Sequence, residues 1–144
     1  MSKKPSIPRL DTELCFALYS ASSRITSIYR PLLEPYGLTY TQFVVLMALW
    51  EEDGVSITQL AEKAGLTNAT MTPLLRRLEE KDFITRERVE GNEREKRVVL
   101  TQSGRDLSRK SGEITESVFC ATGLTKAQAK DMIRNCKRIA ATEE

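Results

Sequence analysis

The residues of this sequence best suited to chemistry are a thiol and a set of phenols. Cys15 lies near the start of a stretch with helical character, where the helix dipole favours a thiolate. Tyr19, Tyr29 and Tyr40 lie in the surrounding predicted helices, and a phenol can donate a hydrogen bond to a thiolate or a sulfenate. A cysteine on a helix is most often a small buried apolar residue. The combination here nevertheless indicates a thiol that can be oxidised.

The spacing of Cys15 and Tyr29 restricts how the two side chains could meet. They are 14 residues apart and nearly on the same helix face, but roughly 21 Å apart along a straight helix. Tyr29 therefore cannot contact Cys15 of its own chain. A second helix packed antiparallel could bring them together, so a tyrosine that serves this thiol requires a two-fold homodimer.

The other two cysteines have different predicted settings. Cys120 lies beside Gly123 at a predicted helix end, where fraying would free the thiol. Cys136 lies in a regular apolar stripe and is expected in the core. If Cys15 has a disulfide partner, we therefore favour Cys120.

The composition excludes several classes of site. Histidine is absent, so a Ser-His-Asp or Cys-His nucleophile and a histidine-ligated metal are not possible. The three cysteines form no C-x-x-C pair, and an odd number argues against a disulfide framework. We expect no metal and no cofactor.

Length and charge set broad limits on the class of protein. The 144 residues amount to a single domain, and a net charge of +2 with a pI of about 8.5 permits nucleic-acid binding without demanding it. No apolar run approaches the roughly 20 residues of a membrane span, and the charged N-terminus has no apolar segment typical of a secretory signal. A cytoplasmic protein without a membrane partner is the expectation.

Residues 57–80 predict two short consecutive helices. The first has one apolar face with i, i+3, i+4, i+7 spacing, formed by Ile57, Leu60, Ala61 and Ala64. Gly65 is expected to end it, and Thr67 or Asn68 to cap the second. The inward stripe of the second helix is Met71, Leu74, Leu75 and Leu78.

The outer face of the second helix is suited to a DNA major groove. Small and hydroxyl side chains at its start let the backbone approach base edges, and arginines further along reach guanine or phosphate. The candidate DNA contacts are Thr67, Asn68, Ala69, Thr70, Thr72, Pro73, Arg76 and Arg77. Pro73 lies inside this helix, where it removes a backbone donor and should bend it.

A basic hairpin is predicted next. Its strands are Phe83–Val89 and Arg94–Thr101, with Gly91-Asn92 as the turn and a short third strand near Val55. The basic residues on or beside its arms are Arg86, Arg88, Arg94, Lys96 and Arg97. Helix, helix, hairpin is the order of a winged helix-turn-helix, whose wing contacts the minor groove or the backbone. A solvated charged hairpin is the alternative, because residues 76–97 hold eight basic and seven acidic side chains.

The flanking segments predict further helices. One helix is expected over Leu10–Arg30, with Asp11 as cap and Pro31 as stop, and another over Thr39–Glu51 with a Thr39-x-x-Gln42 capping box. The side chains expected to face inward from the latter are Phe43, Val44, Leu46, Met47 and Trp50. A long helix should run from Gln102 to about Ala121. A last helix after Thr125 carries a stripe of Ala129, Met132, Ile133, Cys136 and Ala140.

These elements predict a mainly α fold with a small β-hairpin wing. Residues 39–101 would form the winged helix-turn-helix. The segments 10–35 and 102–141 have little of their own to bury against, so we expect them to form a dimerisation region. The whole chain, 1–144, is interpreted as one domain.

The chain resembles a MarR-family regulator, and within it the organic-hydroperoxide-sensing, OhrR-type branch. The resemblance is carried by LCFALYSASSR at 14–24, PLLEPYGLTYTQFVVLMALWE at 31–51, LTNATMTPLLRRLEEKDFITRER at 66–88, and NER with VVLT in the wing. It implies a homodimeric repressor on a palindromic operator. The internal proline at Pro73 is a habit of the family. The family's wing arginine matches Arg94, but the acidic residue usually two positions earlier is Asn92 here.

The resemblance also implies the roles of the thiols and phenols. The thiol matching Cys15 is oxidised to sulfenic acid and is hydrogen-bonded by the tyrosines of the other subunit that match Tyr29 and Tyr40. A second cysteine near Cys120 places the chain in the two-cysteine subgroup, in which an intersubunit disulfide forms.

The expected function is therefore a DNA-binding repressor, not an enzyme, that releases its operator when an organic hydroperoxide oxidises Cys15. The peroxide would enter an apolar pocket near Phe16. Two alternatives stay open: a regulator released by a small aromatic ligand, with Cys15 merely packed, and a thiol peroxidase.

Overall fold

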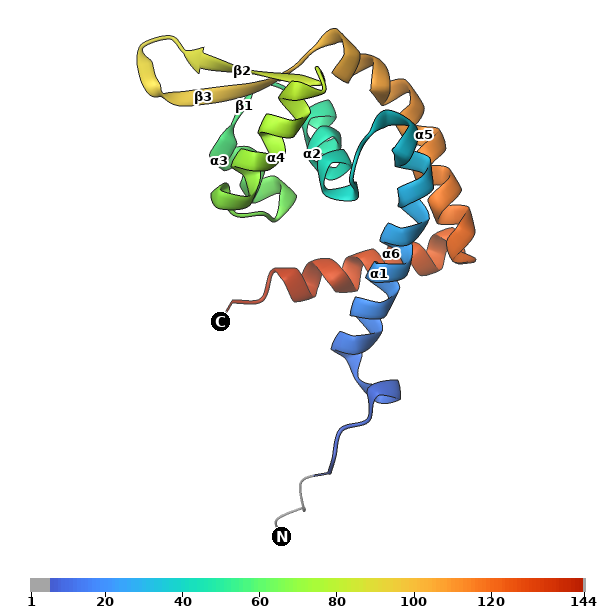
Figure 1. The fold of residues 1–144 in the computed structure, drawn as a ribbon. Helices are drawn as coiled ribbons and strands as arrows, with labels where there is room; N and C mark the ends of the chain where they lie inside the picture. Colours follow the sequence, from blue (N-terminus) through green and yellow to red (C-terminus); the bar gives the residue numbers. More distant parts are fainter. Residues whose placement is uncertain (1–5, 144) are drawn as a thin grey trace.

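The structure, a computed structural model, describes residues 6–143 except the side chain of Glu93. The ends of the expected 1–144 domain, including the charged start of the chain, lie outside the described residues. Within them the fold is mainly helical with a three-stranded antiparallel sheet of order β1-β3-β2, as expected (Figure 1). The helices are α1 Leu14–Leu33, α2 Tyr40–Glu51, α3 Ile57–Ala64, α4 Asn68–Glu80, α5 Gln102–Thr122 and α6 Lys126–Ala140. The strands are β1 Val55–Ser56, β2 Ile84–Val89 and β3 Asn92–Leu100.

The first helix begins later and ends later than the sequence predicted. Leu10–Thr12 forms a separate 3-10 turn, and the cap of α1 is Glu13 rather than Asp11. Pro31 does not stop α1, which continues to Leu33. Leu33 is completely buried, so packing carries the helix past a proline that lacks only its own N–H group.

The second helix is buried on nearly all sides. Phe43 and Leu46 are buried as expected, but Val45 and Leu49 are also completely buried, whereas Val44, Met47 and Trp50 are only half-buried. Helix α2 contacts α1, α3, α4 and α5, so a single inward stripe could not describe it. The predicted capping box forms, with Thr39 Oγ1 accepting the N–H of Gln42.

The helix-turn-helix matches the prediction closely. The C-cap Gly65 adopts a left-handed conformation with φ of 69°, which only glycine adopts readily. Thr67 is the cap of α4, and its hydroxyl accepts the N–H of Thr70 at 3.2 Å. The inward stripe is buried throughout: Met71, Leu74, Leu75 and Leu78. Helix α4 continues without a break through Pro73.

The wing forms with a shorter turn than predicted. β2 and β3 pair antiparallel over their length, and β1 joins as the third strand through Val55 and Ser56. The turn is Glu90-Gly91, with φ of 86° at Gly91, and Asn92 is already the first residue of β3. The register shifts between Arg88 and Val89, because Arg88 pairs with Lys96 whereas Val89 pairs with Asn92.

Gly104 lies where α5 packs closely against residues 39–101, here called the winged helix body. A Cβ atom there would overlap the carbonyl oxygen of Phe83, so only glycine permits this approach. The Trp50 indole donates to the Gly104 carbonyl at 2.9 Å. Gly104 is therefore required for the packing of α5 against residue 83.

The last helix has no buried residue. Cys136, expected in the core, is exposed, and most of the predicted stripe with it, including Met132 and Ile133. In Figure 1, α6 turns back at the end of α5 and runs past α1, below α3 and α4 in this view, while the N-terminal half of α1 extends away from them. Periodicity indicates an apolar face but not what covers it. No helix in the described part of the chain is both long and apolar enough to cross a membrane.

Candidate DNA-binding surface and redox site

The outer face of α4 presents the predicted DNA contacts to solvent. All eight candidate residues on or before this helix are exposed: Thr67, Asn68, Ala69, Thr70, Thr72, Pro73, Arg76 and Arg77. The Thr72 hydroxyl donates to the Asn68 carbonyl at 3.1 Å, which holds this short side chain against the helix. A narrow N-terminal half followed by two guanidinium groups is a surface that fits a major groove.

Arg86 has a different position from the one its sequence suggests. Its side chain is only 22% exposed, and its guanidinium lies 3.1 Å from the Glu79 carboxylate, which also accepts the Arg86 backbone N–H at 3.1 Å. The hydrogen bond from the Arg86 side chain lowers the pKa of Glu79. The pair fixes β2 to the end of α4, so Arg86 orients the wing.

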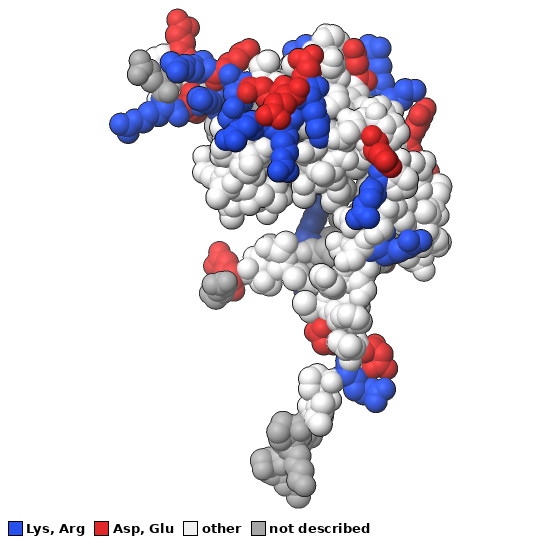
Figure 2. Space-filling view, in the orientation of Figure 1, with Lys and Arg blue, Asp and Glu red and all other residues white. Residues whose placement is uncertain are grey.

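The remaining basic residues of the wing are exposed. Arg88, Arg94 and Lys96 all face solvent, and Figure 2 shows Lys and Arg gathered over the wing with acidic side chains among them. Asn92 stands where the family usually has an acidic residue. It is uncharged, and its Oδ1 accepts the backbone N–H of Arg94 at 3.1 Å. Among the ion pairs formed by described side chains, none involves Arg94.

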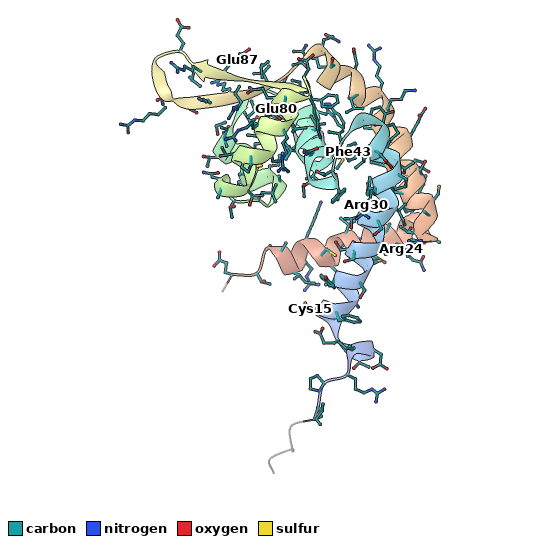
Figure 3. The ribbon with its side chains drawn as sticks, in the orientation of Figure 1. Cys15, Arg24, Arg30, Phe43, Glu80 and Glu87 are labelled. Carbon is teal, nitrogen blue, oxygen red and sulfur yellow. The ribbon has the colours of Figure 1, made fainter. Side chains whose placement is uncertain are left out.

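Cys15 lies at the exposed N-terminal end of α1, far from the body (Figure 3). The Glu13 carboxylate caps this end by accepting the N–H groups of Cys15, at 3.1 Å, and Phe16, at 2.7 Å. This carboxylate was not among the predicted capping residues, although a Glu just before the apolar run is a capping signal. Within one chain, solvent surrounds the thiol.

Tyr29 and Tyr40 come together at the opposite end of α1. Their ring centroids are 4.8 Å apart, and Tyr29 also contacts Phe43 with centroids 5.8 Å apart. Tyr29 is only 8% exposed, and burial, followed by the neighbouring Tyr40, raises the pKa of its phenol. The fold thus holds a protonated phenol, a hydrogen-bond donor, beside a second one. Tyr19 is separate from this pair and is 69% exposed.

Phe16, near which an apolar pocket was expected, does not itself line the apolar groove formed by its neighbours in α1. Phe16 is itself 41% exposed. This groove of about 650 Å³ lies between α1 and α6, on a different face of α1 from Cys15. Its lining is Leu14, Ala17, Leu18, Ala21, Met132, Asn135, Cys136, Arg138, Ile139 and Thr142.

The three thiols are all free and exposed within the described chain. Cys120 lies in the last turn of α5, and its thiol is 3.8 Å from the Glu116 carboxylate, to which it can donate. Because Cys136 is not buried, burial no longer favours Cys120 over Cys136 as a disulfide partner. The described residues contain no cluster of three or more acidic or cysteine side chains that could hold a metal ion.

The sequence is similar to those of known transcriptional regulators. The MarR family model matches residues 38–96. The HTH-type transcriptional regulator SarZ of Staphylococcus aureus is 37% identical over 128 residues, covering 89% of this chain and 86% of SarZ. SarZ of Staphylococcus epidermidis is 36% identical over 126 residues, covering 88% of this chain and 85% of that protein.

Two solved structures extend the comparison. Overoxidised AbfR bound to DNA is 27% identical with a TM-score of 0.73, over 91% of this chain and 92% of AbfR, a Staphylococcus epidermidis protein. Bordetella bronchiseptica BpsR, whose DNA binding is regulated by 6-hydroxynicotinic acid, has a TM-score of 0.86 at 21% identity, over 96% and 100% of the two chains. The latter likeness concerns the fold alone. From the SarZ match and the winged helix geometry together, this chain belongs to the MarR family and is a DNA-binding transcriptional regulator.

Proposed function

We propose that this regulator is a homodimeric repressor whose operator affinity is controlled by oxidation of Cys15 by an organic hydroperoxide. The observation that carries the proposal is the separation of two halves of one site. An exposed thiol lies at one end of α1, and a packed pair of phenols, the buried Tyr29 and the half-buried Tyr40, lies at the other end. The roughly 21 Å between Cys15 and Tyr29 along α1 is closed only when a second copy packs antiparallel.

The phenols are suited to binding an oxidised sulfur. A phenol keeps its proton at neutral pH and can donate a hydrogen bond to a negatively charged acceptor, and burial raises the pKa of Tyr29 further. In the proposed dimer, Cys15 of one subunit is hydrogen-bonded by the partner subunit's Tyr29 and the partner subunit's Tyr40. The relative AbfR supports redox control in this group, since it has been solved on DNA in both reduced and overoxidised forms.

The chemical step needs only the thiol and the peroxide. The Cys15 thiolate attacks the terminal oxygen of the hydroperoxide, an S–O bond forms and the O–O bond breaks. The sulfur is oxidised by two electrons to sulfenic acid, and the peroxide is reduced to an alcohol whose alkoxide takes up a proton. The apolar side chains around Cys15, such as Leu14 and Phe16, favour an organic peroxide over hydrogen peroxide.

A second thiol can then convert sulfenic acid to a disulfide. The sulfur of Cys120 of the partner subunit attacks the Cys15 sulfur, the S–S bond forms, and the hydroxyl leaves as water with the proton of the attacking thiol. Cys120 is chosen over Cys136 because the family resemblance places a second cysteine near this position. Both thiols are exposed, so each can be tested.

Release of the operator follows from the spacing of two recognition helices. Each subunit presents α4, and a palindromic operator requires the two helices about 34 Å apart, one turn of DNA. A disulfide between the dimerisation helices changes this spacing. A hundredfold weaker complex requires only about 2.7 kcal/mol of lost contact energy.

The decisive comparison is operator binding before and after a stoichiometric organic hydroperoxide, measured by fluorescence anisotropy. The parent protein should lose affinity, Cys15→Ser should stay bound, and Cys136→Ser serves as a matched thiol control. Cys120→Ser should block the disulfide-linked dimer on a non-reducing gel. Release of Cys15→Ser as fast as the parent would refute the sensor role.

The α1–α6 groove favours one alternative. An apolar space of about 650 Å³ is large enough for a small aromatic acid, which would release DNA without any oxidation. Release by such a ligand under reducing conditions, with Cys15→Ser responding like the parent, would support the alternative.

A further inference from the structure

The end of the recognition helix is tied to the start of α2 by one lysine. Lys81 follows α4 as its C-cap residue. Its ammonium group donates to Oε1 of Gln42 at 3.0 Å and to the backbone carbonyl of Gly37. We call Lys81, Gln42 and Gly37 the lysine bridge. These contacts span 39 and 44 residues of sequence, so they are tertiary links rather than local caps.

The acceptor in this bridge is held rigidly. Gln42 is only 2% exposed and is the one buried polar residue among those described. The same Oε1 atom accepts the Thr39 backbone N–H at 3.1 Å, as part of the capping box of α2. A buried amide that loses a hydrogen-bond partner is costly, so the position of Gln42 is fixed by the helix cap. The hydrogen bond from Lys81 to Gln42 therefore restrains the end of α4 relative to the start of α2.

The same helix start carries one of the two phenols. Tyr40 is the first residue of α2, two positions before Gln42, and its ring packs at a tilted angle against Tyr29 of α1. A displacement at the phenol pair therefore moves the cap to which Lys81 is bonded. The lysine bridge is a physical connection between the phenols and the DNA-binding helix.

We infer that Lys81 is a positioning residue for DNA binding, which sets the orientation of α4 through Gln42 rather than contacting DNA. Its first role, orienting α4 for DNA binding, is argued from these hydrogen bonds and needs only the family assignment, not the proposed redox function. Its second role, passing a change at Tyr29 and Tyr40 to α4, rests on the proposed function.

A phosphate contact is the competing explanation for any lysine beside a recognition helix. The two roles differ in their salt dependence, because each phosphate contact contributes about 0.9 to the slope of log affinity against log salt. A positioning lysine leaves that slope unchanged when it is removed. Only the affinity at every salt concentration falls.

The test uses the full-length protein in its reduced form on an operator duplex. Lys81→Met should weaken binding about tenfold, equivalent to about 1.4 kcal/mol, with the salt slope unchanged. Lys81→Arg, which can still donate to both oxygens, should restore most of the affinity. Lys110→Met is the matched control, because this exposed lysine of α5 carries the same charge and should change neither quantity.

Three results would overturn the inference: unchanged affinity for Lys81→Met, a salt slope lowered by about one, or no recovery with Lys81→Arg. A thermal melt accompanies each variant. Should Lys81→Met be unfolded at the assay temperature, Gln42→Glu decides. This variant keeps the acceptor oxygen and should bind DNA at least as well as the parent, whereas tenfold weaker binding would contradict the bridge.

The peroxide arm is measured separately. In the parent, oxidation should weaken operator binding by about a hundredfold, and in Lys81→Met this factor should shrink because the link to α4 is cut. If the parent shows no peroxide effect, the proposed redox function fails while the reduced-protein affinities still test the bridge. If oxidation weakened operator binding of Lys81→Met by the same factor as in the parent, Lys81 would not transmit the change at Tyr29 and Tyr40 to α4.

Discussion

In α2, the side chains of Phe43, Val45, Leu46 and Leu49 are completely buried, whereas α6 buries none of its residues. Residues 39–101, the winged helix body, share one core with the C-terminal half of α1 and with α5, which contribute Leu33, Leu107 and Val118. The N-terminal half of α1 together with α6, here called the arms, lies outside this core with apolar side chains in contact with solvent (Figure 1). In the proposed dimer, the arms form the interface.

The difference indicates where the chemistry must be. Cys15 lies on an arm, and Tyr29 and Tyr40 lie where α1 enters the body. In the proposed dimer, the site is assembled from an arm of one subunit and the body of the other. DNA binding and oxidation of the thiol would then be coupled through the same subunit contact.

The largest contrast should appear on truncation of one apolar side chain in each region. Phe43→Ala removes a completely buried ring and should cost about 3–5 kcal/mol of unfolding free energy. Ile133→Ala, on an exposed position of α6, should leave the unfolding free energy of dilute protein nearly unchanged. Urea unfolding at low protein concentration measures both.

The same α6 variant should instead weaken dimerisation. Sedimentation equilibrium of Ile133→Ala should show a larger fraction of monomer than the parent. A dimer that is indifferent to this position, combined with a large loss of monomer stability, would place α6 in the body and remove the contrast between the two regions.

A smaller effect is expected where α5 leaves the body. Gly104→Ala places a Cβ atom against the Phe83 carbonyl oxygen and should cost about 1–3 kcal/mol. Gly112→Ala is the matched control, because a Cβ atom at Gly112 meets no heavy atom within 4 Å. That variant should be neutral or slightly stabilising, since alanine favours a helix. Equal effects at the two glycines would mean that the contact with Phe83 is not tight.

The smallest effect is expected at the ion pair of Glu79 with Arg86, which links α4 to the wing. The pKa of Glu79 is lowered in the fold, chiefly by its hydrogen bond with Arg86, so its stabilising contribution is present above its ordinary value of 4.5. It is lost as the pH falls through the lower folded value. Glu79→Gln should therefore reduce stability at pH 7, by less than about 1 kcal/mol for a partly exposed pair, and have little effect at pH 3. A loss that is equal at both pH values would exclude the charge as its cause.

The sequence predicted the body better than the arms, for a physical reason. Apolar spacing, the capping residues Thr39 and Thr67, and Gly65 are local signals, and each was confirmed. The start of α1 was wrong because the capping carboxylate of Glu13 was overlooked, and its end because burial of Leu33 outweighs Pro31. Cys136 was expected in the core because periodicity identifies an apolar face without saying what covers it.

The sequence allowed the residues of the candidate site to be predicted, but not the contacts between them. The residue types at Cys15, Tyr29 and Tyr40 indicated redox chemistry, but the contact between the two phenols depends on how α1 packs on α2. The pairing of Arg86 with Glu79 and the bonds of Lys81 join residues whose distance in space no local pattern encodes.

The central claim, a thiol of one subunit served by the phenols of the other, is tested most directly with two mixed dimers. In the first, one subunit carries both Cys15→Ser and Tyr29→Phe/Tyr40→Phe, and its partner is unaltered. In the second, one subunit carries Cys15→Ser and the partner carries the two tyrosine changes. The rate of sulfenic acid formation by an organic hydroperoxide is measured in each. The site across subunits predicts a parent-like rate at the remaining thiol of the second dimer only, and a parent-like rate in the first dimer only would contradict it.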